Sequence, residues 1–263
     1  GQNPWNFLIT VDSTGDVGYN PSIKIGSNGY LYIAYTDESN QTIKLAQSSD
    51  GGDTWVFKVV DTTSVQYSSL DMSCQLNGDI YLAYCYNNSL RVAKSDDGGS
   101  TWSYSDVPKP SSTNYVTDVN IRIDNNIIYV STSRTYTYGN GSQYERLYLS
   151  KSADDGATWT TSMIQDNAGA YNILQVSNGV LYIIYCDGTR WHAVDQHIRL
   201  AKSIDNGSTW TLSTIDAYGD SGYLISLLVE DDDLYVSYSN DIDPYGSTYL
   251  LFMKSLDGGV SWY

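Results

Sequence analysis

The sequence predicts an all-β fold built from five repeats of four antiparallel strands. The first observation is a motif, S-x-D-x-G-x-(T/S)-W, that occurs five times in the 263 residues, with tryptophans 47 to 57 residues apart. The second is a set of five alternating apolar segments, one in each repeat. The third is that no helical periodicity and no linker interrupts this pattern. Self-similarity at such a period is typical of a repeat architecture, so we expect five equivalent units.

Each motif is expected to form the turn between the third and fourth strands of its unit. Asp and Ser side chains accept hydrogen bonds from backbone N–H groups two or three residues further on, which tightens a turn. Gly adopts backbone angles that a Cβ forbids, and Thr and Trp suit the strand that follows. Because a structural role predicts repetition in every unit, we interpret the acids as turn-forming and the tryptophans as wedges between sheets. These residues are Asp50, Asp97, Asp154, Asp205 and Asp257, with Trp55, Trp102, Trp159, Trp210 and Trp262.

The first unit shows how four strands are predicted from the pattern. Pro21–Ile25 and Tyr30–Thr36 are alternating segments on either side of Asn28-Gly29, a strong hairpin signal. Ile43–Ser48 leads into the motif, and the fourth strand follows Trp55. The same order predicts one domain, residues 1–263, with units at 19–61, 67–108, 114–166, 170–216 and 222–263.

The last unit is expected to be completed by the N-terminal segment, residues 5–12. This segment resembles Trp55–Asp61 and Trp210–Asp216, which follow two of the motifs. The fifth motif ends at Trp262-Tyr263 without such a segment after it. We therefore expect residues 5–12 to be the fourth strand of the last sheet, which would tie both termini together and remove exposed strand edges.

The five motifs resemble the Asp-box (BNR) repeat of sialidase-like β-propellers, and the resemblance covers essentially the whole chain. It implies a five-bladed β-propeller. Sialidases of this family have six blades, three arginines that bind the substrate carboxylate, a Tyr–Glu nucleophile pair and an acid/base Asp. The family's Phe/Tyr-Arg-Ile-Pro segment is missing here, since residues 19–24 contain no Arg, and no Tyr–Glu pair is recognisable. Only Arg122, Arg134 and Arg190 are placed to converge, so the resemblance implies the scaffold rather than the activity.

The candidate ligand site lies at the end of the blades opposite the motif turns. Long connections follow the second strand in units three, four and five, and irregular loops on a rigid scaffold often carry function. A Tyr recurs near the start of each first strand, where we expect it at the mouth of the central channel. Tyr rings stack on sugars while their hydroxyls form hydrogen bonds. The site residues that we predict are Tyr19, Tyr67, Tyr115, Tyr171, Tyr223, Arg122, Arg134, Arg190, Trp191 and His192, with Asn172 as a further hydroxyl-binding side chain.

Composition excludes several function classes. A formal net charge of -16 argues against nucleic-acid and anionic-membrane partners. No segment approaches the roughly 18 apolar residues of a membrane-spanning helix, and three Cys are too few for a disulfide framework. We predict no cofactor and no metal site. A surface rich in Tyr, Ser, Asn and Gly is typical of a secreted or cell-surface protein.

The sequence therefore predicts a non-catalytic, secreted or cell-surface propeller that binds a ligand, with a glycan as the first candidate. One alternative is a sialidase-like glycoside hydrolase with a divergent site. A second is a structural module that associates with copies of itself. Convergence of Arg122, Arg134 and Arg190 would favour the hydrolase or an acidic-sugar lectin, whereas dispersal would favour a neutral sugar or self-assembly.

Overall fold

The computed structural model describes residues 8–62, 69–110, 115–137, 143–187, 196–217, 220–241 and 248–263, and the side chains of all of these except 220–223 and 241. Every element of regular secondary structure in the described residues is a β-strand. No helix in this part of the chain is long and apolar enough to cross a membrane. The chain divides into two compact units, Gly1–Asn87 with Val92–Tyr104, and Asn88–Arg91 with Ser105–Tyr263.

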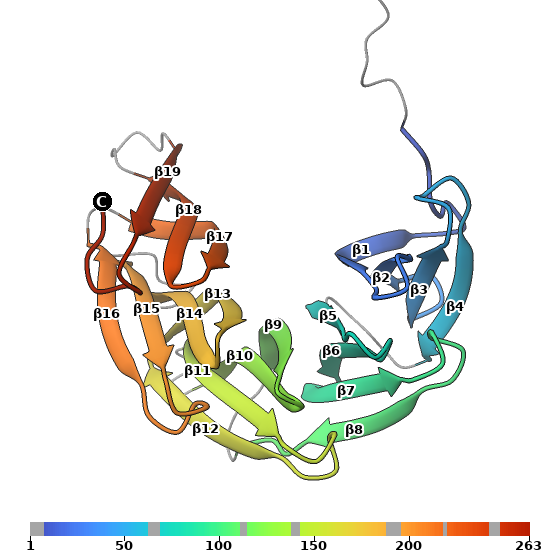
Figure 1. Cartoon of the computed structure of the whole chain (residues 1–263), viewed down its shortest axis with the longest axis horizontal. Helices are drawn as coiled ribbons and strands as arrows, with labels where there is room; N and C mark the ends of the chain where they lie inside the picture. Colours follow the sequence, from blue (N-terminus) through green and yellow to red (C-terminus); the bar gives the residue numbers. More distant parts are fainter. Residues whose placement is uncertain are drawn as a thin grey trace, which may run out of the picture. The chain divides into compact units, whose positions relative to one another are not determined.

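The strands form five antiparallel sheets in which neighbours along the chain pair with each other (Figure 1). The first sheet contains β1 (Val17–Ile25), β2 (Leu31–Asp37), β3 (Thr42–Ser48) and β4 (Val56–Asp61). The second contains β5 (Leu70–Cys74), β6 (Ile80–Tyr86), β7 (Ser89–Ser95) and β8 (Ser103–Val107). The third contains β9 (Tyr115–Asp124), β10 (Ile127–Thr137), β11 (Gln143–Ser152) and β12 (Thr160–Asp166). The fourth contains β13 (Ala168–Ser177), β14 (Val180–Asp187), β15 (Ile198–Ser203) and β16 (Thr211–Asp216), and the fifth β17 (Asp220–Glu230), β18 (Asp233–Asp241) and β19 (Thr248–Ser255).

These sheets confirm the predicted all-β class, and four of the five sheets have the predicted order of four strands, with three strands described in the fifth. In the first unit the predicted segments differ from β1, β2 and β3 only at their ends. The predicted closing strand is not seen in the described residues, because residues 8–12 lie outside any strand and the fifth sheet has three strands there. Residues 5–7 lie outside the described residues, so the closing strand stays a prediction.

The described cores lie between the apolar faces of neighbouring sheets, because alternate side chains of a strand point in opposite directions and a strand can be apolar on both faces. We call the face that carries Leu82 of β6, and its equivalents in the other second strands, the front, and the opposite face the back. In the N-terminal unit, Tyr32, Ala34 and Leu45 on the back of the first sheet pack with Met72 and Leu82 on the front of the second. In the C-terminal unit, the back of each sheet likewise packs on the front of the next, in two successive cores. One pattern of alternation therefore builds every described core.

The first strands of four sheets share a backbone irregularity. The pairing of β1, β9, β13 and β17 with their neighbours shifts register near the N-terminal part of each strand. At each shift a non-glycine residue adopts a left-handed conformation, namely Asn20, Asp118, Tyr171 and Leu224. Bulges of this kind bend a strand and redirect its side chains. They lie at the end of the sheets that is opposite the motif turns.

Candidate functional site

Four hydrogen bonds recur in the motif turns of all five repeats: the Thr or Ser before the Trp donates its N–H and its hydroxyl to the motif Asp, and the first Ser donates to that Asp and accepts from the Gly N–H. In the fourth repeat, Asp205 Oδ1 accepts hydrogen bonds from Ser208 N (3.1 Å) and Thr209 N (2.8 Å), and its Oδ2 accepts one from Thr209 Oγ1 (2.6 Å). Ser203 Oγ donates to Asp205 Oδ1 at 2.8 Å and accepts from Gly207 N at 2.9 Å. Each motif Asp therefore accepts hydrogen bonds from the donors of its own turn. This arrangement supports the structural interpretation of the five acids.

The hydrogen bonds also control the charge of these carboxylates. Hydrogen bonds from Thr54 hold the pKa of Asp50 at about 2, and those from Thr158 hold the pKa of Asp154 at about 2. Hydrogen bonds from the equivalent residues Thr101, Thr209 and Ser261 lower the pKa of Asp97, Asp205 and Asp257. A carboxylate with a lowered pKa is a poor proton donor at neutral pH. The motif acids are therefore unsuited to general-acid catalysis.

The glycine of the motif is required by its backbone and its packing. Gly99 has a φ of 86°, and a Cβ at this position would lie 2.6 Å from Leu45 Cδ2 and 3.4 Å from Trp102 Cζ2. The turn thus brings the motif backbone against its own tryptophan and a leucine of the preceding sheet. This contact explains why Gly and Trp occur together in the motif.

The opposite end of the sheets, which we call the loop end, has a less regular set of contacts. In the C-terminal unit, β9 and β13 lie next to each other, and their bulges meet. Asp118 Oδ2 accepts a hydrogen bond from the backbone N–H of Tyr171 at 2.9 Å. Both residues have positive φ, 46° and 55°. Strained residues of this kind persist where the surrounding structure fixes them, and they are common at binding sites.

Asn172 forms a buried polar network beside these bulges. Its Nδ2 donates to Asp118 O and to Ser133 Oγ, both at 3.0 Å, and its Oδ1 accepts from Ser131 Oγ at 2.6 Å. The side chain is almost completely buried. The prediction that Asn172 binds ligand hydroxyls is therefore wrong: its amide is used to hold two sheets together.

The predicted tyrosines do not occupy equivalent positions. One position of each first strand can be aligned between sheets, because it pairs with the same position of the second strand. This position is Ser22, Asn120, Ile173 and Ser226 in β1, β9, β13 and β17. Tyr19 and Tyr223 lie three residues before the aligned position of their strand. Tyr115 lies five residues before it, and Tyr171 lies two residues before it. Tyr19 and Tyr115 are about half exposed, and Tyr171 is partly buried. These tyrosines therefore lie near the start of the first strands, at different positions along them, and their role in a ligand site stays a prediction.

The two described arginines of the candidate site do not converge. Arg122 is paired with Tyr129 on β10, near the turn to that strand, and its Nε donates to Gln175 Oε1 at 3.0 Å. Arg134 lies five residues further along β10, a separation of roughly 17 Å at about 3.3 Å per residue. Arg134 is completely buried and its guanidinium lies 5.6 Å from the centre of the Tyr148 ring. This dispersal is the outcome that favours a neutral sugar or self-assembly.

Several predicted residues cannot be placed. Arg190, Trp191, His192 and Tyr67 lie outside the described residues, and for Tyr223 only the backbone in β17 is described. Their predicted roles stay predictions. In the described residues, no group of three or more His, Cys, Asp or Glu side chains is arranged to hold a metal ion.

An arginine–tyrosine cluster next to the connection between β10 and β11 was not predicted. The Arg146 guanidinium lies 4.3 Å from the Tyr136 ring centre and 5.4 Å from that of Tyr144, and its Nε pairs with Asp166 at 2.7 Å. Such cation–π contacts are more favourable when they are desolvated. The alternation of Tyr144, Arg146 and Tyr148 along β11 was the sequence signal, because alternate residues share one face of a strand.

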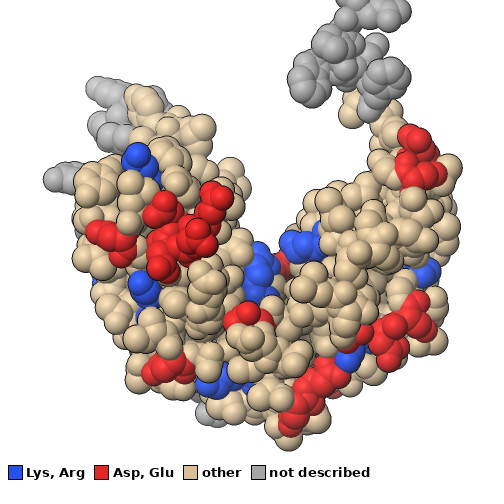
Figure 2. Space-filling model, in the orientation of Figure 1, with Lys and Arg blue, Asp and Glu red and all other residues tan. Residues whose placement is uncertain are grey.

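The charge distribution differs from that of an anion-binding surface. On the face shown in Figure 2, acidic side chains form separate patches with smaller groups of basic side chains between them, and most of the surface is uncharged. The formal net charge of -16 has the same sign. A surface of this kind favours neutral or cationic ligands over acidic ones.

Comparisons with known proteins give the fold. No family model and no curated protein matches the chain. Among solved structures, a Penicillium chrysogenum α-L-arabinanase complexed with arabinobiose has a TM-score of 0.63 and 14% identity, over 94% of this chain and 80% of that one. A Hadza microbial sialidase has a TM-score of 0.62 and 18% identity, over 93% of this chain. The chain has a β-propeller fold. A protein of unknown function from Dyadobacter fermentans is similarly close, with a TM-score of 0.65, 15% identity and coverage of 89% of this chain and 75% of that one.

The structural similarity covers most of this chain but only part of the longer chains that resemble it. The chain spans 57% of the length of the sialidase chain. The structural similarity supports a sialidase-like propeller scaffold. Because the sequence identities are so low, no catalytic residue can be transferred from these proteins to this chain. The described residues form five sheets, and this number is consistent with the predicted five-bladed propeller.

Proposed function

We propose that the protein is a non-catalytic glycan-binding propeller whose ligand binds at the loop end of the sheets. The observation that carries the proposal is the pair of bulged strands β9 and β13, where Asp118 holds the left-handed backbone of Tyr171. The half-exposed Tyr115 begins the same strand as Asp118. Tyrosines held by a rigid backbone suit the apolar faces and hydroxyls of a sugar ring.

A neutral saccharide fits the charges better than an acidic one. Recognition of a sugar carboxylate relies on arginines that point into one site. Arg122 and Arg134 lie far apart along their sheet, and Arg134 is buried. The net negative charge also opposes an acidic ligand.

Glycoside hydrolysis is the alternative function. It is favoured by the solved structures that resemble this chain, which include a sialidase and an α-L-arabinanase. Against it, no sialidase-like arginine cluster forms from the described arginines, and the Asp of each motif turn is occupied by its own turn. We therefore propose binding without turnover.

The finer features of the sequence prediction belong to the same proposal. We propose five blades in one domain, with residues 5–12 as the fourth strand of the last sheet. We also propose a secreted or cell-surface location, which suits a glycan ligand, and we propose that neither nucleic acid nor a cofactor is bound.

Calorimetric titration with arabinobiose, after a screen on a glycan array, tests the proposal. Tyr115→Ala and Trp191→Ala should each weaken binding at least ~10-fold, about 1.4 kcal/mol, because few anchors usually supply most of the binding energy. Tyr263→Ala is the matched control, since Tyr263 is an exposed tyrosine next to a motif turn. It should leave the affinity unchanged.

Three results would contradict the proposal. An array without hits would remove the glycan, and equal losses in the Tyr263 control would remove the loop end as the site. Turnover of a fluorogenic glycoside by the wild type would replace binding by hydrolysis.

A further inference from the structure

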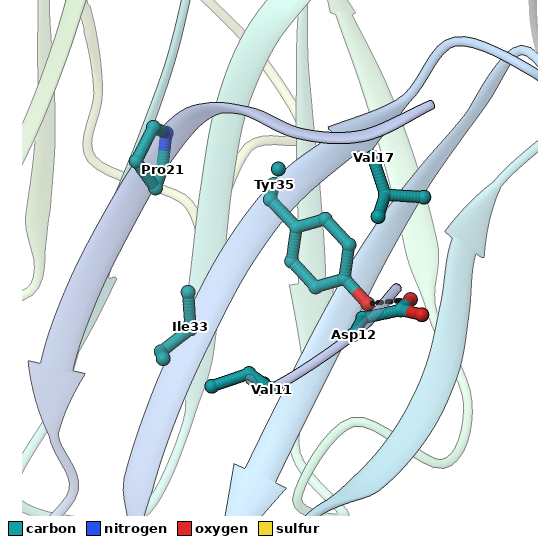
Figure 3. Close-up of a pocket in the computed structure, with 7 residues that line it drawn as sticks. Val11, Asp12, Val17, Pro21, Ile33 and Tyr35 are labelled. Carbon is teal, nitrogen blue, oxygen red and sulfur yellow. Dashed lines mark hydrogen bonds between the residues drawn. The ribbon is translucent and has the colours of Figure 1, made fainter. Parts of the chain in front are cut away.

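A buried tyrosine donates a hydrogen bond to an aspartate in three of the sheets. The pairs are Tyr35 with Asp12 at 2.7 Å (Figure 3), Tyr84 with Asp61 at 2.6 Å, and Tyr238 with Asp216 at 2.7 Å. Tyr185 occupies the same position in the fourth sheet and is fully buried. Among the described residues, its hydroxyl has no hydrogen-bond partner. The fourth sheet therefore carries the donor of this contact in a buried place without an acceptor.

The position of the acceptor holds a glutamine in the third sheet. Asp61 and Asp216 lie on the fourth strand of the sheet that precedes their tyrosine. Strand pairing places Gln165 of β12 at the same position. The next residue, Asp166, pairs with an arginine of its own sheet at 2.7 Å. Neither side chain accepts the hydrogen of the Tyr185 hydroxyl.

A second buried donor lies beside Tyr185. Arg199 of β15 is the cross-strand neighbour of Tyr185, so the two side chains share one face of the sheet. Its Nη1 pairs with Asp187 Oδ2 at 3.2 Å, and its Nε is buried without a hydrogen-bond partner among the described residues. Burial raises the pKa of Tyr185 to about 12, although the nearby charge of Arg199 acts in the opposite direction. The hydroxyl therefore stays protonated at neutral pH, and a guanidinium has no acceptor for its hydrogen.

The first sheet shows what such a pair of donors holds. There, Lys44 is the cross-strand neighbour of Tyr35. Lys44 Nζ pairs at 2.7 Å with Asp37, which has the position of the aspartate that pairs with the arginine in the fourth sheet. The carboxylate of Asp12 accepts hydrogen bonds from Tyr35 at 2.7 Å and from Lys44 at 3.2 Å. One tyrosine and one cation thus bind a carboxylate, and a second carboxylate nearby does not prevent it.

We propose that Tyr185 and Arg199 form a binding site for the carboxylate of a small ligand. The ligand carboxylate takes the role that Asp12 has in the first sheet, and it accepts hydrogen bonds from the Tyr185 hydroxyl and from Arg199 Nε. Buried donors without an acceptor are costly, so an acceptor at this place removes a penalty. Hydrogen bonds between a guanidinium and a carboxylate are also stronger than those between neutral groups.

The site is close to the surface and separate from the proposed glycan site. The side chains of Arg199 and Asp187 are 29% and 24% exposed, which brings the two donors near the surface of the loop end. Both donors lie on β14 and β15, whereas Tyr115 and the bulges lie on the first strands. The net charge of -16 slows the approach of anions, but the affinity depends on the hydrogen bonds that form at contact.

Calorimetric titration with sodium acetate tests the proposal. The wild type should bind acetate, and it should bind acetamide, an uncharged molecule of the same shape, at least ~10-fold more weakly. D-Glucuronate is the second probe, because a carboxylate can come from a sugar acid or from a free small acid. Tighter binding of glucuronate would identify a sugar acid as the ligand, and tighter binding of acetate a small acid.

Gln165→Asp is the decisive variant, because it supplies a carboxylate at the position that Asp61 and Asp216 have in other sheets. It should raise the melting temperature and weaken acetate binding at least ~10-fold. Tyr185→Phe should weaken binding by a similar factor without raising the melting temperature. Ser162→Asp adds the same charge to an exposed residue of the same strand and should bind acetate like the wild type.

Three results would overturn the carboxylate site. The first is a wild type that does not bind acetate, or that responds equally to sodium chloride at the same ionic strength. The second is equal affinity of the wild type and Tyr185→Phe for acetate, with circular dichroism confirming that the variant is folded. The third is a Gln165→Asp variant that still binds acetate and is no more stable than the wild type.

Discussion

The two ends of the sheets are built by different rules. At the motif-turn end, one Asp, one Ser and one Thr or Ser repeat the same hydrogen bonds in every repeat, as Asp205, Ser203 and Thr209 do in the fourth. At the loop end, the shared element is a backbone bulge whose residue changes from Asn20 to Asp118, Tyr171 and Leu224. Because the bulge keeps its backbone conformation with four different side chains, the side chain at this position is available for binding. The comparison therefore separates a scaffold end from a candidate binding end.

The loop end also has one regular contact of its own. The bond from Tyr35 to Asp12 joins the N-terminal segment to the first sheet, and Lys44 pairs with Asp12 at 3.2 Å and with Asp37 at 2.7 Å. Hydrogen bonds and the Lys44 charge hold the pKa of Asp12 at about 2 despite its burial, which by itself would raise it. Asp12 is thus kept ionised, and the segment before it is fixed at its C-terminal end.

Deletion of residues 1–12 should have the largest effect on this comparison. It removes Asp12 from Lys44 and Tyr35, and it removes the predicted fourth strand of the last sheet, which leaves an edge strand unprotected. We expect loss of cooperative thermal unfolding, or aggregation. Deletion of residues 1–4 is the control, since it keeps the predicted strand. An unchanged melting temperature after the longer deletion would refute the closing strand.

Asp205→Ala should separate the two ends of the sheets. The substitution removes the acceptor for two backbone N–H groups and two hydroxyls, so the melting temperature should fall. Affinity for the ligand should stay unchanged, because the motif turn lies away from the loop end. A binding defect without a loss of stability would reverse the assignment of the two ends.

The same variant has a defined pH dependence. The pKa of Asp205 is lowered in the folded protein, so its contribution to stability is present above the ordinary carboxyl pKa and is lost as the pH falls through the folded value. The difference in melting temperature between wild type and Asp205→Ala should therefore be largest at neutral pH and shrink in acid. A difference that does not depend on pH would contradict this origin.

The sequence predicted the regular parts of the molecule much better than the irregular ones. The motif turns and the strands around them follow from local chemistry, because each turn is closed by its own side chains. The spacing of Tyr115 and Tyr171 could not be predicted, since a bulge adds a residue to one strand without a distinctive sequence. The burial of Arg134 depends on residues distant in the chain, and periodicity places such a side chain on a face without showing what covers it.

Tyr84→Phe should test the regular contact of the loop end with a smaller effect. It removes the donor to Asp61 in a buried site, which should lower the free energy of unfolding by about 1–3 kcal/mol. Tyr185→Phe is the matched control, because Tyr185 has the same position in the fourth sheet and its buried hydroxyl has no hydrogen-bond partner among the described residues. Chemical denaturation that gives equal losses for both variants would show that the Tyr–Asp bond contributes nothing.

Leu224→Gly should have the smallest effect and the opposite sign. Leu224 has a φ of 54° and is largely exposed, so its side chain adds strain to the bulge and little packing. A left-handed conformation costs a non-glycine residue roughly 1–2 kcal/mol, whereas glycine loses roughly 0.5–1 kcal/mol through its greater freedom in the unfolded chain. The difference predicts a gain of about 0.5–1 kcal/mol in the free energy of unfolding, measured by chemical denaturation. Because the bulge itself is kept, binding at Tyr115 should not change, and a destabilised variant would show that the Leu224 side chain packs against a partner.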